Sequence, residues 1–276
     1  MAYNIVNLKS PKGQRKGYTI LMKKTIVHLL LFMLFLSGCT TVPPKTATVG
    51  DEDYYTQGMK EMARTYFGEA IVSFEDLREK FPLSSYAILA LLRMGECQYL
   101  QKNYIEAQYS FENFRRMHPS HEQVAYSMFM AGMCQFKQVL DFYRDQAAAR
   151  GAVTQFDMLL EAFPDSPYTG LALCKIAEAK QHIAENEFFV GTFYLKNNDY
   201  RGAYARFDQV LLKYPDAISR DKVLLSMAKA CLYDGQTEKG IRILQLLTDT
   251  YPDSSCSAEV DRLQDMYEPV VVSKTQ

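Results

Sequence analysis

One spacing recurs along this chain and constrains its fold more than any other feature. Gly58 is followed after 12 residues by an alanine, after four more by a phenylalanine and after eight more by a proline. The same residue types return at the same spacing from Gly95 and from Gly191. Ala228 begins a weaker copy, and Gly132 begins a fifth that fits when eight residues are inserted. Repetition at a fixed period predicts stacked copies of one supersecondary unit.

These residue types are the ones that a pair of antiparallel helices needs. A small residue in the first helix and an alanine early in the second let the two helices approach closely. The phenylalanine fills the groove that they share, and the proline ends the second helix because it cannot continue one. The packing positions predicted in this way are Gly58, Ala70, Phe74, Gly95, Ala107, Phe111, Gly132, Ala152, Phe156, Gly191, Ala203 and Phe207.

The pattern resembles the tetratricopeptide repeat, a helix–turn–helix unit of about 34 residues. We therefore predict an all-α fold, a right-handed superhelix (solenoid) of about five such repeats. The interval from Pro164 to Gly191 is 27 residues, whereas the other intervals from a proline to the next small residue are 13. The extra length predicts a long first helix in repeat four, from about residue 167 to 197, which would measure ~45 Å. It would join repeats 1–3 (51–165) to repeats 4–5 and a capping helix (166–268), with a disordered tail at 269–276.

The N-terminal part carries a targeting signal. An apolar run from Ile26 follows two lysines and ends in Leu36-Ser37-Gly38-Cys39. A basic region, an apolar region of roughly 7–15 residues and small residues before a cleavage site describe a secretory signal peptide. The run is shorter than the ~20 residues that a membrane-spanning helix needs. The tetrapeptide resembles the bacterial lipobox, in which the cysteine is cleaved free and acylated.

We accordingly predict a lipoprotein signal peptide at 22–38 and a flexible tether at 39–50 that begins with lipidated Cys39, which would carry a diacylglycerol and an N-acyl chain. An ordinary signal peptide that happens to end in a cysteine is the alternative. Residues 1–21 show no signal character, and we interpret them as a non-native extension from an over-extended reading frame.

Charge argues against nucleic acid as a partner. The chain has 31 Lys or Arg and 32 Asp or Glu, but residues 1–38 hold six of the basic residues and no acidic one. The predicted mature part therefore has 25 basic and 32 acidic residues, a net charge of −7. Binding to nucleic acid depends on neutralising phosphates, so we expect none.

We find no catalytic constellation in the sequence. It contains no G-x-S-x-G, no phosphate-binding loop and no H-E-x-x-H. The five cysteines besides Cys39 are widely spaced and form no C-x-x-C, so a zinc site is not expected; whether two of them form a disulfide stays open. We predict a protein that is not an enzyme and that holds no metal or other cofactor.

The first helices of the repeats offer a binding surface instead, since in a superhelix of helix pairs they line the concave side. Aromatic residues, methionine and leucine recur there at helical spacing, and such side chains suit a groove for apolar peptide segments. The groove residues predicted for unfolded client proteins are Tyr55, Met59, Met62, Leu92, Tyr99, Tyr126, Phe129, Met133 and Phe136. The alternative is that this stripe packs on a neighbouring helix.

Several features together resemble one family. They are the lipobox, the five repeats, the long helix, the insertion with Arg144-Asp145-Gln146, the run Phe156-x-x-Leu159-x-x-x-Phe163-Pro164-Asp165-Ser166-Pro167-Tyr168, and Tyr200-x-x-Ala203-x-x-Arg206-Phe207. The combination is similar to the BamD (YfiO/ComL) family, lipoproteins of the outer-membrane β-barrel assembly machine. The resemblance covers residues 51 to 267.

The resemblance implies a scaffold that is lipid-anchored in the outer membrane and faces the periplasm. Its partners would be the POTRA domains of a BamA-like subunit, unfolded β-barrel clients and other lipoproteins of the machine. Arg206 matches an arginine of the family on the BamA-facing repeat, and Thr40 after the lipidated cysteine fits outer-membrane sorting. A tetratricopeptide pilotin or cell-envelope adaptor for a secretin, pilus or peptidoglycan system is the alternative, although the insertion and the long helix favour barrel assembly.

Overall fold

The chain was analysed as a computed structural model that describes residues 49–274. Every regular element in that range is a helix, so the prediction of an all-α fold is confirmed there. The predicted signal peptide, the lipobox residues Leu36, Ser37 and Gly38, and lipidated Cys39 lie outside the described residues. The helices are α2 (Asp51–Ala63), α3 (Phe67–Lys80), α4 (Ser85–Leu100), α5 (Tyr104–Met117), α6 (Val124–Phe136), α7 (Ala147–Ala162), α8 (Thr169–Lys196), α9 (Tyr200–Lys213), α10 (Arg220–Tyr233), α11 (Thr237–Thr250) and α12 (Ser257–Lys274).

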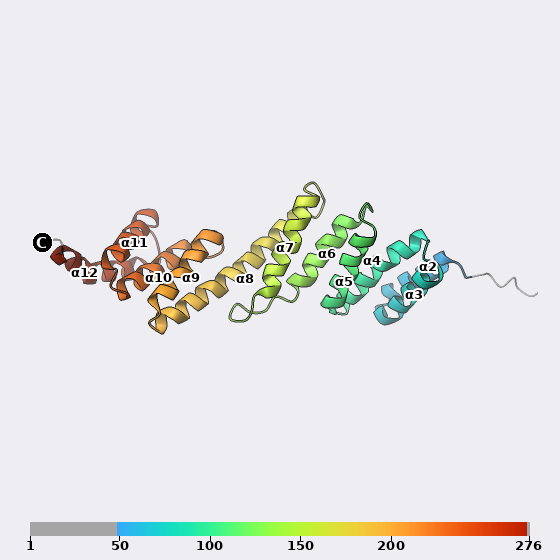
Figure 1. Cartoon of the computed structure of the whole chain (residues 1–276), viewed down its shortest axis with the longest axis horizontal. Helices are drawn as coiled ribbons and strands as arrows, with labels where there is room; N and C mark the ends of the chain where they lie inside the picture. The colour runs from blue at the N-terminus through green and yellow to red at the C-terminus, as the bar shows by residue number, and fades with distance from the viewer. Residues whose placement is uncertain (1–48, 275–276) are drawn as a thin grey trace, which may run out of the picture. The chain divides into compact units, whose positions relative to one another are not determined.

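The helices form five pairs and a cap within one compact unit that begins at Gly50. Each helix packs against the next one in the chain, from α2 on α3 to α11 on α12 (Figure 1). First helices also approach one another, α2 with α4, α6 with α8 and α8 with α10. Among the described residues the second helices make no contacts of comparable extent with one another. The first helices therefore lie on the inner side of the stack.

The repeated small residues and phenylalanines meet inside each of the first four pairs. A Cβ atom on Gly58 would lie 2.6 Å from Phe74, and one on Gly191 would lie 2.7 Å from Phe207. Ala70, Ala107, Ala152 and Ala203, like the four phenylalanines of the pattern, are 0% exposed. In the fifth pair the glycine is on the second helix, where Gly240 faces Leu232. Close approach of two helices therefore fixes the position of each glycine.

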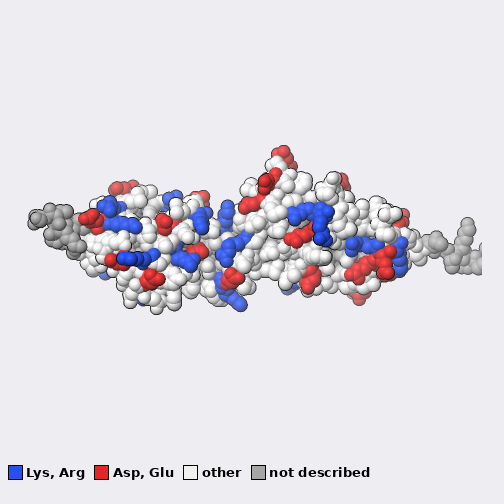
Figure 2. All heavy atoms as spheres, viewed as in Figure 1, with Lys and Arg blue, Asp and Glu red and all other residues white. Residues whose placement is uncertain are grey.

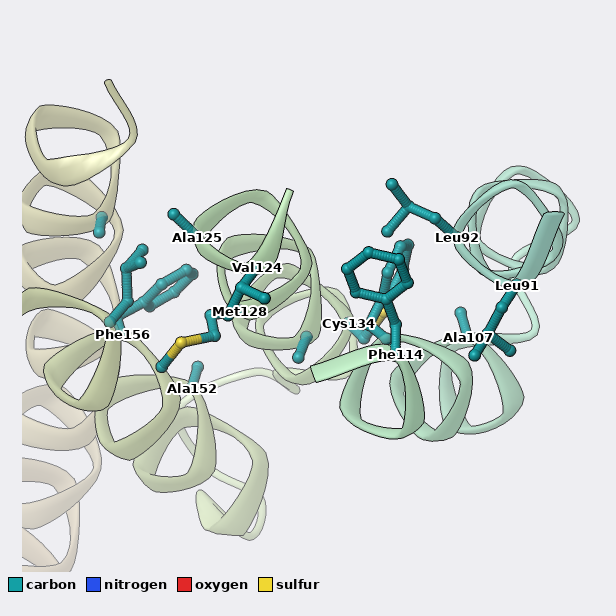
Figure 3. Packing of buried hydrophobic residues seen from close by; sticks show 14 of the residues in the cluster. Leu91, Leu92, Ala107, Phe114, Val124, Ala125, Met128, Cys134, Ala152 and Phe156 are labelled. Carbon is teal, nitrogen blue, oxygen red and sulfur yellow. The ribbon is translucent and has the colours of Figure 1, made fainter. Parts of the chain in front are cut away.

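The pairs share a continuous apolar core. The largest cluster runs from α4 to α8, and in it Phe156 of α7 faces Met128 of α6 while Phe114 of α5 lies next to Leu92 of α4 (Figure 3). A fully buried side chain of this size contributes ~1.5–3 kcal/mol of transfer free energy. Since neighbouring pairs bury each other's faces, a single pair would lack most of this stabilisation.

Helix α8 has 28 residues and lies within two residues of its predicted bounds at each end. Its N-terminal half buries Ile176, Ala179 and Ile183 towards the preceding pair, where Ala179 and Ile183 pack with Ala149 of α7. Its C-terminal half buries Ala184 and Gly191 against α9. One helix thus serves two successive pairs, because it is about twice as long as its neighbours.

The C-terminus differs from the prediction. Helix α12 continues to Lys274, whereas a tail without structure was predicted from residue 269. Proline fixes a backbone φ that suits a helix and removes only one hydrogen-bond donor. Pro269 therefore does not end α12, and residues 269–274 extend the capping helix.

Candidate protein-binding surface

The predicted groove residues lie along the first helices α2, α4 and α6. Tyr55, Met59, Met62, Tyr99, Tyr126, Phe129, Met133 and Phe136 are all half-buried: each packs against the core beneath and keeps part of its surface open. Leu92 is different, because it is 1% exposed inside the core cluster between α4 and α7. Its assignment to the groove is wrong, since a client could not reach it. We call the other eight residues the first-helix surface.

Two tyrosines that the sequence reasoning did not assign to the groove belong with this surface. The ring of Tyr168 stacks on Phe129 with centroids 5.4 Å apart and lies 5.6 Å from Tyr126. The ring of Tyr86 lies 5.1 Å from that of Tyr55. Both tyrosines end the same local pattern, F-P-x-S-x-Y, just before or inside the next first helix. That recurrence was the available signal.

An ion pair lies between the aromatic groups of α2 and α6. The Arg93 guanidinium donates from Nη1 to both carboxylate oxygens of Glu96 at 2.8 Å, and its Nε donates to the Tyr55 hydroxyl at 3.3 Å. Glu96 is 8% exposed. Burial, together with the negative charge of Glu96, raises the pKa of Tyr126, so this hydroxyl stays neutral. The surface is therefore apolar with one compensated charge pair in it.

The cysteines near this surface are poor nucleophiles. Burial raises the pKa of the Cys97 thiol and of the Cys134 thiol to about 12, so both stay protonated at neutral pH. Cys97, Cys134, Cys174, Cys231 and Cys256 are all unpaired thiols in the described part of the chain. Within residues 49–274 no cluster of His, Cys, Asp and Glu has the geometry to hold a metal ion. The side chains gathered here can bind a polypeptide but offer no reactive group.

Arg206 lies on α9, away from the first-helix surface. Its Nη1 donates to Glu187 of α8 at 2.6 Å, and its guanidinium lies 6.0 Å from the centre of the Tyr194 ring. The hydrogen bond to Glu187 raises the pKa of Arg206. The side chain is still 39% exposed. Arg206 thus ties the two helices of repeat four together and keeps part of its guanidinium open to a partner.

Charge is distributed without a field of one sign on the face drawn in Figure 2, where basic and acidic side chains alternate along the stack. None of the helices between residues 49 and 274 combines the length and the apolarity of a membrane span.

Stacked helix pairs with a glycine–phenylalanine contact in each, and an apolar first-helix surface, define a tetratricopeptide-repeat protein. The outer membrane lipoprotein family YfiO matches residues 48–239 of this chain. The chain therefore belongs to that family, as the resemblance predicted.

Relatives agree with this assignment. The outer membrane protein assembly factor BamD of Caulobacter vibrioides is 25% identical over 241 residues, which cover 86% of this chain and 79% of the relative. The protein of the same description from Rickettsia prowazekii is 22% identical over 248 residues, 90% of this chain and 99% of the relative.

A solved tetratricopeptide repeat protein from Parabacteroides merdae superposes with a TM-score of 0.34 at 16% identity, over 78% of this chain and 73% of that protein.

Proposed function

We propose that this protein is a non-enzymatic scaffold lipoprotein for the assembly of outer-membrane β-barrels. Family membership supports the proposal, as do relatives whose description is outer membrane protein assembly factor. In this proposal Cys39 carries the acyl chains, residues 40–50 form the tether, and the repeats face the periplasm.

The observation that carries the proposal is the first-helix surface. Eight aromatic and methionine side chains on three successive first helices are open on one side and supported by core on the other. Side chains held in this way lose little conformational freedom when a ligand covers them, which favours binding. Methionines adapt their shape and aromatic rings supply contact area. The surface suits an extended, aromatic-rich segment of an unfolded barrel client.

Binding of a client strand tests this surface. We would measure the affinity of the mature chain for a synthetic aromatic-rich C-terminal strand of an outer-membrane barrel. Phe129→Ala should weaken binding about ten-fold, since buried aromatic contacts dominate interfaces. The matched control is Tyr109→Ala, because Tyr109 is 65% exposed on second helix α5.

Folding must be checked in the same experiment because Phe129 also packs on Phe156 at 5.8 Å. Thermal unfolding of Phe129→Ala identifies any loss caused by instability, and Phe129→Leu keeps apolar volume at the site. If Phe129→Ala stayed folded and bound the strand as tightly as the unchanged chain, the client surface would be wrong.

The proposed partner subunit is BamA-like, with a contact at Arg206. The open part of the guanidinium supports this role, because arginine can bond a carboxylate while keeping Glu187. Arg206→Glu should reduce recovery of the barrel-forming subunit from detergent-solubilised membranes. Glu187→Gln is the control, since it weakens the internal ion pair but leaves Arg206 in place. Recovery of a secretin without the barrel-forming subunit would favour the pilotin alternative.

The anchor is tested by Cys39→Ser. This variant should lose acylation and leave the membrane fraction while the repeats stay folded. A Cys39→Ser protein that remained fully membrane-bound in cells lacking its partners would contradict the lipid anchor.

A further inference from the structure

A pocket of about 460 Å³ lies where three separate parts of the chain meet. These parts are the insertion between α6 and α7, the C-terminal half of α8, and the connection from α9 to α10. The lining residues are Phe142, Glu185, Phe188, Phe189, Thr192, Ala217 and Ile218. The volume falls in the range of ligand-binding clefts, ~300–1,000 Å³. None of the first-helix surface residues lines this pocket.

The insertion is held firmly where it forms the wall of the pocket. The Asn186 side-chain amide donates to the carbonyl oxygens of Phe142 at 2.6 Å and Arg144 at 3.2 Å. The amide of Gln146 donates to the carbonyl oxygens of Asp141 and Arg144, both at 3.0 Å, and Gln146 is 1% exposed. A wall fixed before binding has little freedom left to lose, which favours association.

Large aromatic side chains are exposed in and beside the pocket. The rings of Phe142 and Phe189 meet edge to face at 5.7 Å, although these residues stay 40% and 44% exposed. Tyr143, against Phe142, is 58% exposed, and Phe193, one turn after Phe189, is 56% exposed. Contiguous exposed apolar surface marks an interaction site, whereas single exposed side chains do not. Because the aromatic surface continues beyond the pocket, a polypeptide segment would cover it better than a small molecule.

The charge at the pocket selects the kind of segment. Glu185 is the one charged residue among the lining residues, and its Oε1 accepts a hydrogen bond from the Gln181 amide at 2.9 Å rather than pairing with a cation. The insertion adds Asp141, Arg144 and Asp145, a net charge of −1. A carboxylate at the edge of an apolar pocket attracts a cation and repels an anion, including the free carboxylate at a chain terminus.

We propose that this pocket docks a segment of a partner protein in which a large apolar side chain stands directly beside a lysine or arginine. The apolar side chain enters between Phe142, Phe189 and Ile218, and the cation pairs with Glu185. This site is separate from the first-helix surface and goes beyond the function proposed above.

The test uses the mature chain and three short peptides, acetylated and amidated at their ends. One has a phenylalanine flanked by lysines, the second has the same phenylalanine flanked by glutamates, and the third has alanine between lysines. The first peptide should bind at least about ten-fold more tightly than the other two, a difference of about 1.4 kcal/mol. Equal binding of all three peptides, or preference for the glutamate peptide, would overturn the proposal.

Variants locate the binding. Phe189→Ser should weaken the lysine–phenylalanine peptide about ten-fold, and Glu185→Lys should reverse the preference in favour of the glutamate peptide. Leu171→Ser is the matched control, since Leu171 is 56% exposed on the same helix, ~27 Å away. Phe129→Ala, on the first-helix surface, should leave this affinity unchanged, which separates the two sites. If Glu185→Lys did not alter the preference, the assignment of the cation would be wrong.

Discussion

In repeats one, two, four and five, three residues join the two helices, whereas in repeat three ten residues do so. The middle residue of each short connection has a positive φ: Thr65, Lys102, Asn198 and Gly235. In the described chain, the connection of repeat three has no such residue. Nevertheless, the helices of repeat three pack like the others, with Gly132 against Phe156.

The comparison shows that the packing of a helix pair does not depend on the connection that closes it. Lengthening a flexible connection from three to ten residues costs only about 1 kcal/mol of closure entropy, which is small beside a buried phenylalanine. Repeat three is therefore free to use its connection for another purpose. Its insertion forms a wall of the pocket on α8, where the short turns of the other repeats could not reach.

The largest effect should come from the shared phenylalanine. Phe156→Ala in repeat three and Phe111→Ala in repeat two each remove a side chain that is 0% exposed. Each change should lower the free energy of unfolding by ~3–5 kcal/mol. Denaturant titration of both variants measures this. A much smaller loss for Phe156→Ala would show that the insertion does weaken the core of its pair.

A smaller effect should distinguish the glycines of the same two repeats. A Cβ atom on Gly132 would lie 2.5 Å from Phe156, but one on Gly95 would lie 3.0 Å from Phe111. Alanine gains ~1 kcal/mol over glycine in a helix, while overpacking costs ~1–3 kcal/mol. Gly132→Ala should therefore destabilise the protein by ~1–2 kcal/mol, and Gly95→Ala should be nearly neutral. Equal stabilities of the two variants would contradict the difference in closeness.

The short turns should respond to glycine, and the insertion should not. Thr65 has a φ of 63°, a conformation that costs most residues ~1–2 kcal/mol and glycine almost nothing. Thr65→Gly should raise the melting temperature, with a gain of up to ~1 kcal/mol after the entropy of the unfolded chain is counted. Asn198→Gly should gain less because asparagine tolerates positive φ.

The control for the turns is Leu140→Gly in the insertion, where no positive φ has to be relieved. It should give no stabilisation. A gain at Leu140 equal to that at Thr65 would mean that backbone strain is not the cause.

The smallest effect should come from acid, at the C-terminal end only. Hydrogen bonds from Arg262 of α12 and Lys229 of α10 lower the pKa of Glu259 from 4.5 to about 2. A lowered pKa in the folded state adds stability that is present above pH 4.5 and is lost as the pH falls towards 2. The insertion is held by the neutral amides of Gln146 and Asn186, whose bonds do not titrate.

Hydrogen exchange measured between pH 5 and pH 2.5 checks this contrast. The amides of α12 should lose protection earlier than those of residues 141–146. Glu259→Gln should remove the pH dependence at α12. Simultaneous loss of protection in both regions would show that the ion pairs of Glu259 are not what acid disrupts.

The repeat and its packing positions could be predicted because they follow from local steric requirements. A glycine opposite a phenylalanine leaves a periodic mark in the sequence, and a proline ends a helix wherever it falls. The long helix α8 could be predicted from spacing alone. Pro269 was misjudged, because proline permits helical φ and its single lost donor does not decide where a terminal helix ends.

The candidate site was only partly predictable. Helical spacing identified the face that carries Tyr55, Tyr126 and Phe129, but it could not distinguish half-buried Phe129 from Leu92, which the stacking of α4 on its neighbours covers completely. Tyr86 and Tyr168 join this face because the chain turns back before each first helix. Their common F-P-x-S-x-Y pattern carried the information, although its meaning needed the packing.

By itself, the sequence determined the helix pairs, their order and the family, since each depends on residues close together in the chain. Tertiary structure alone decided the pocket, which brings Phe142, Phe189 and Ile218 together across 76 residues of chain. No periodicity links these three residues. They meet because α8 is long enough to reach past its own pair and because two side-chain amides hold the insertion of repeat three against it.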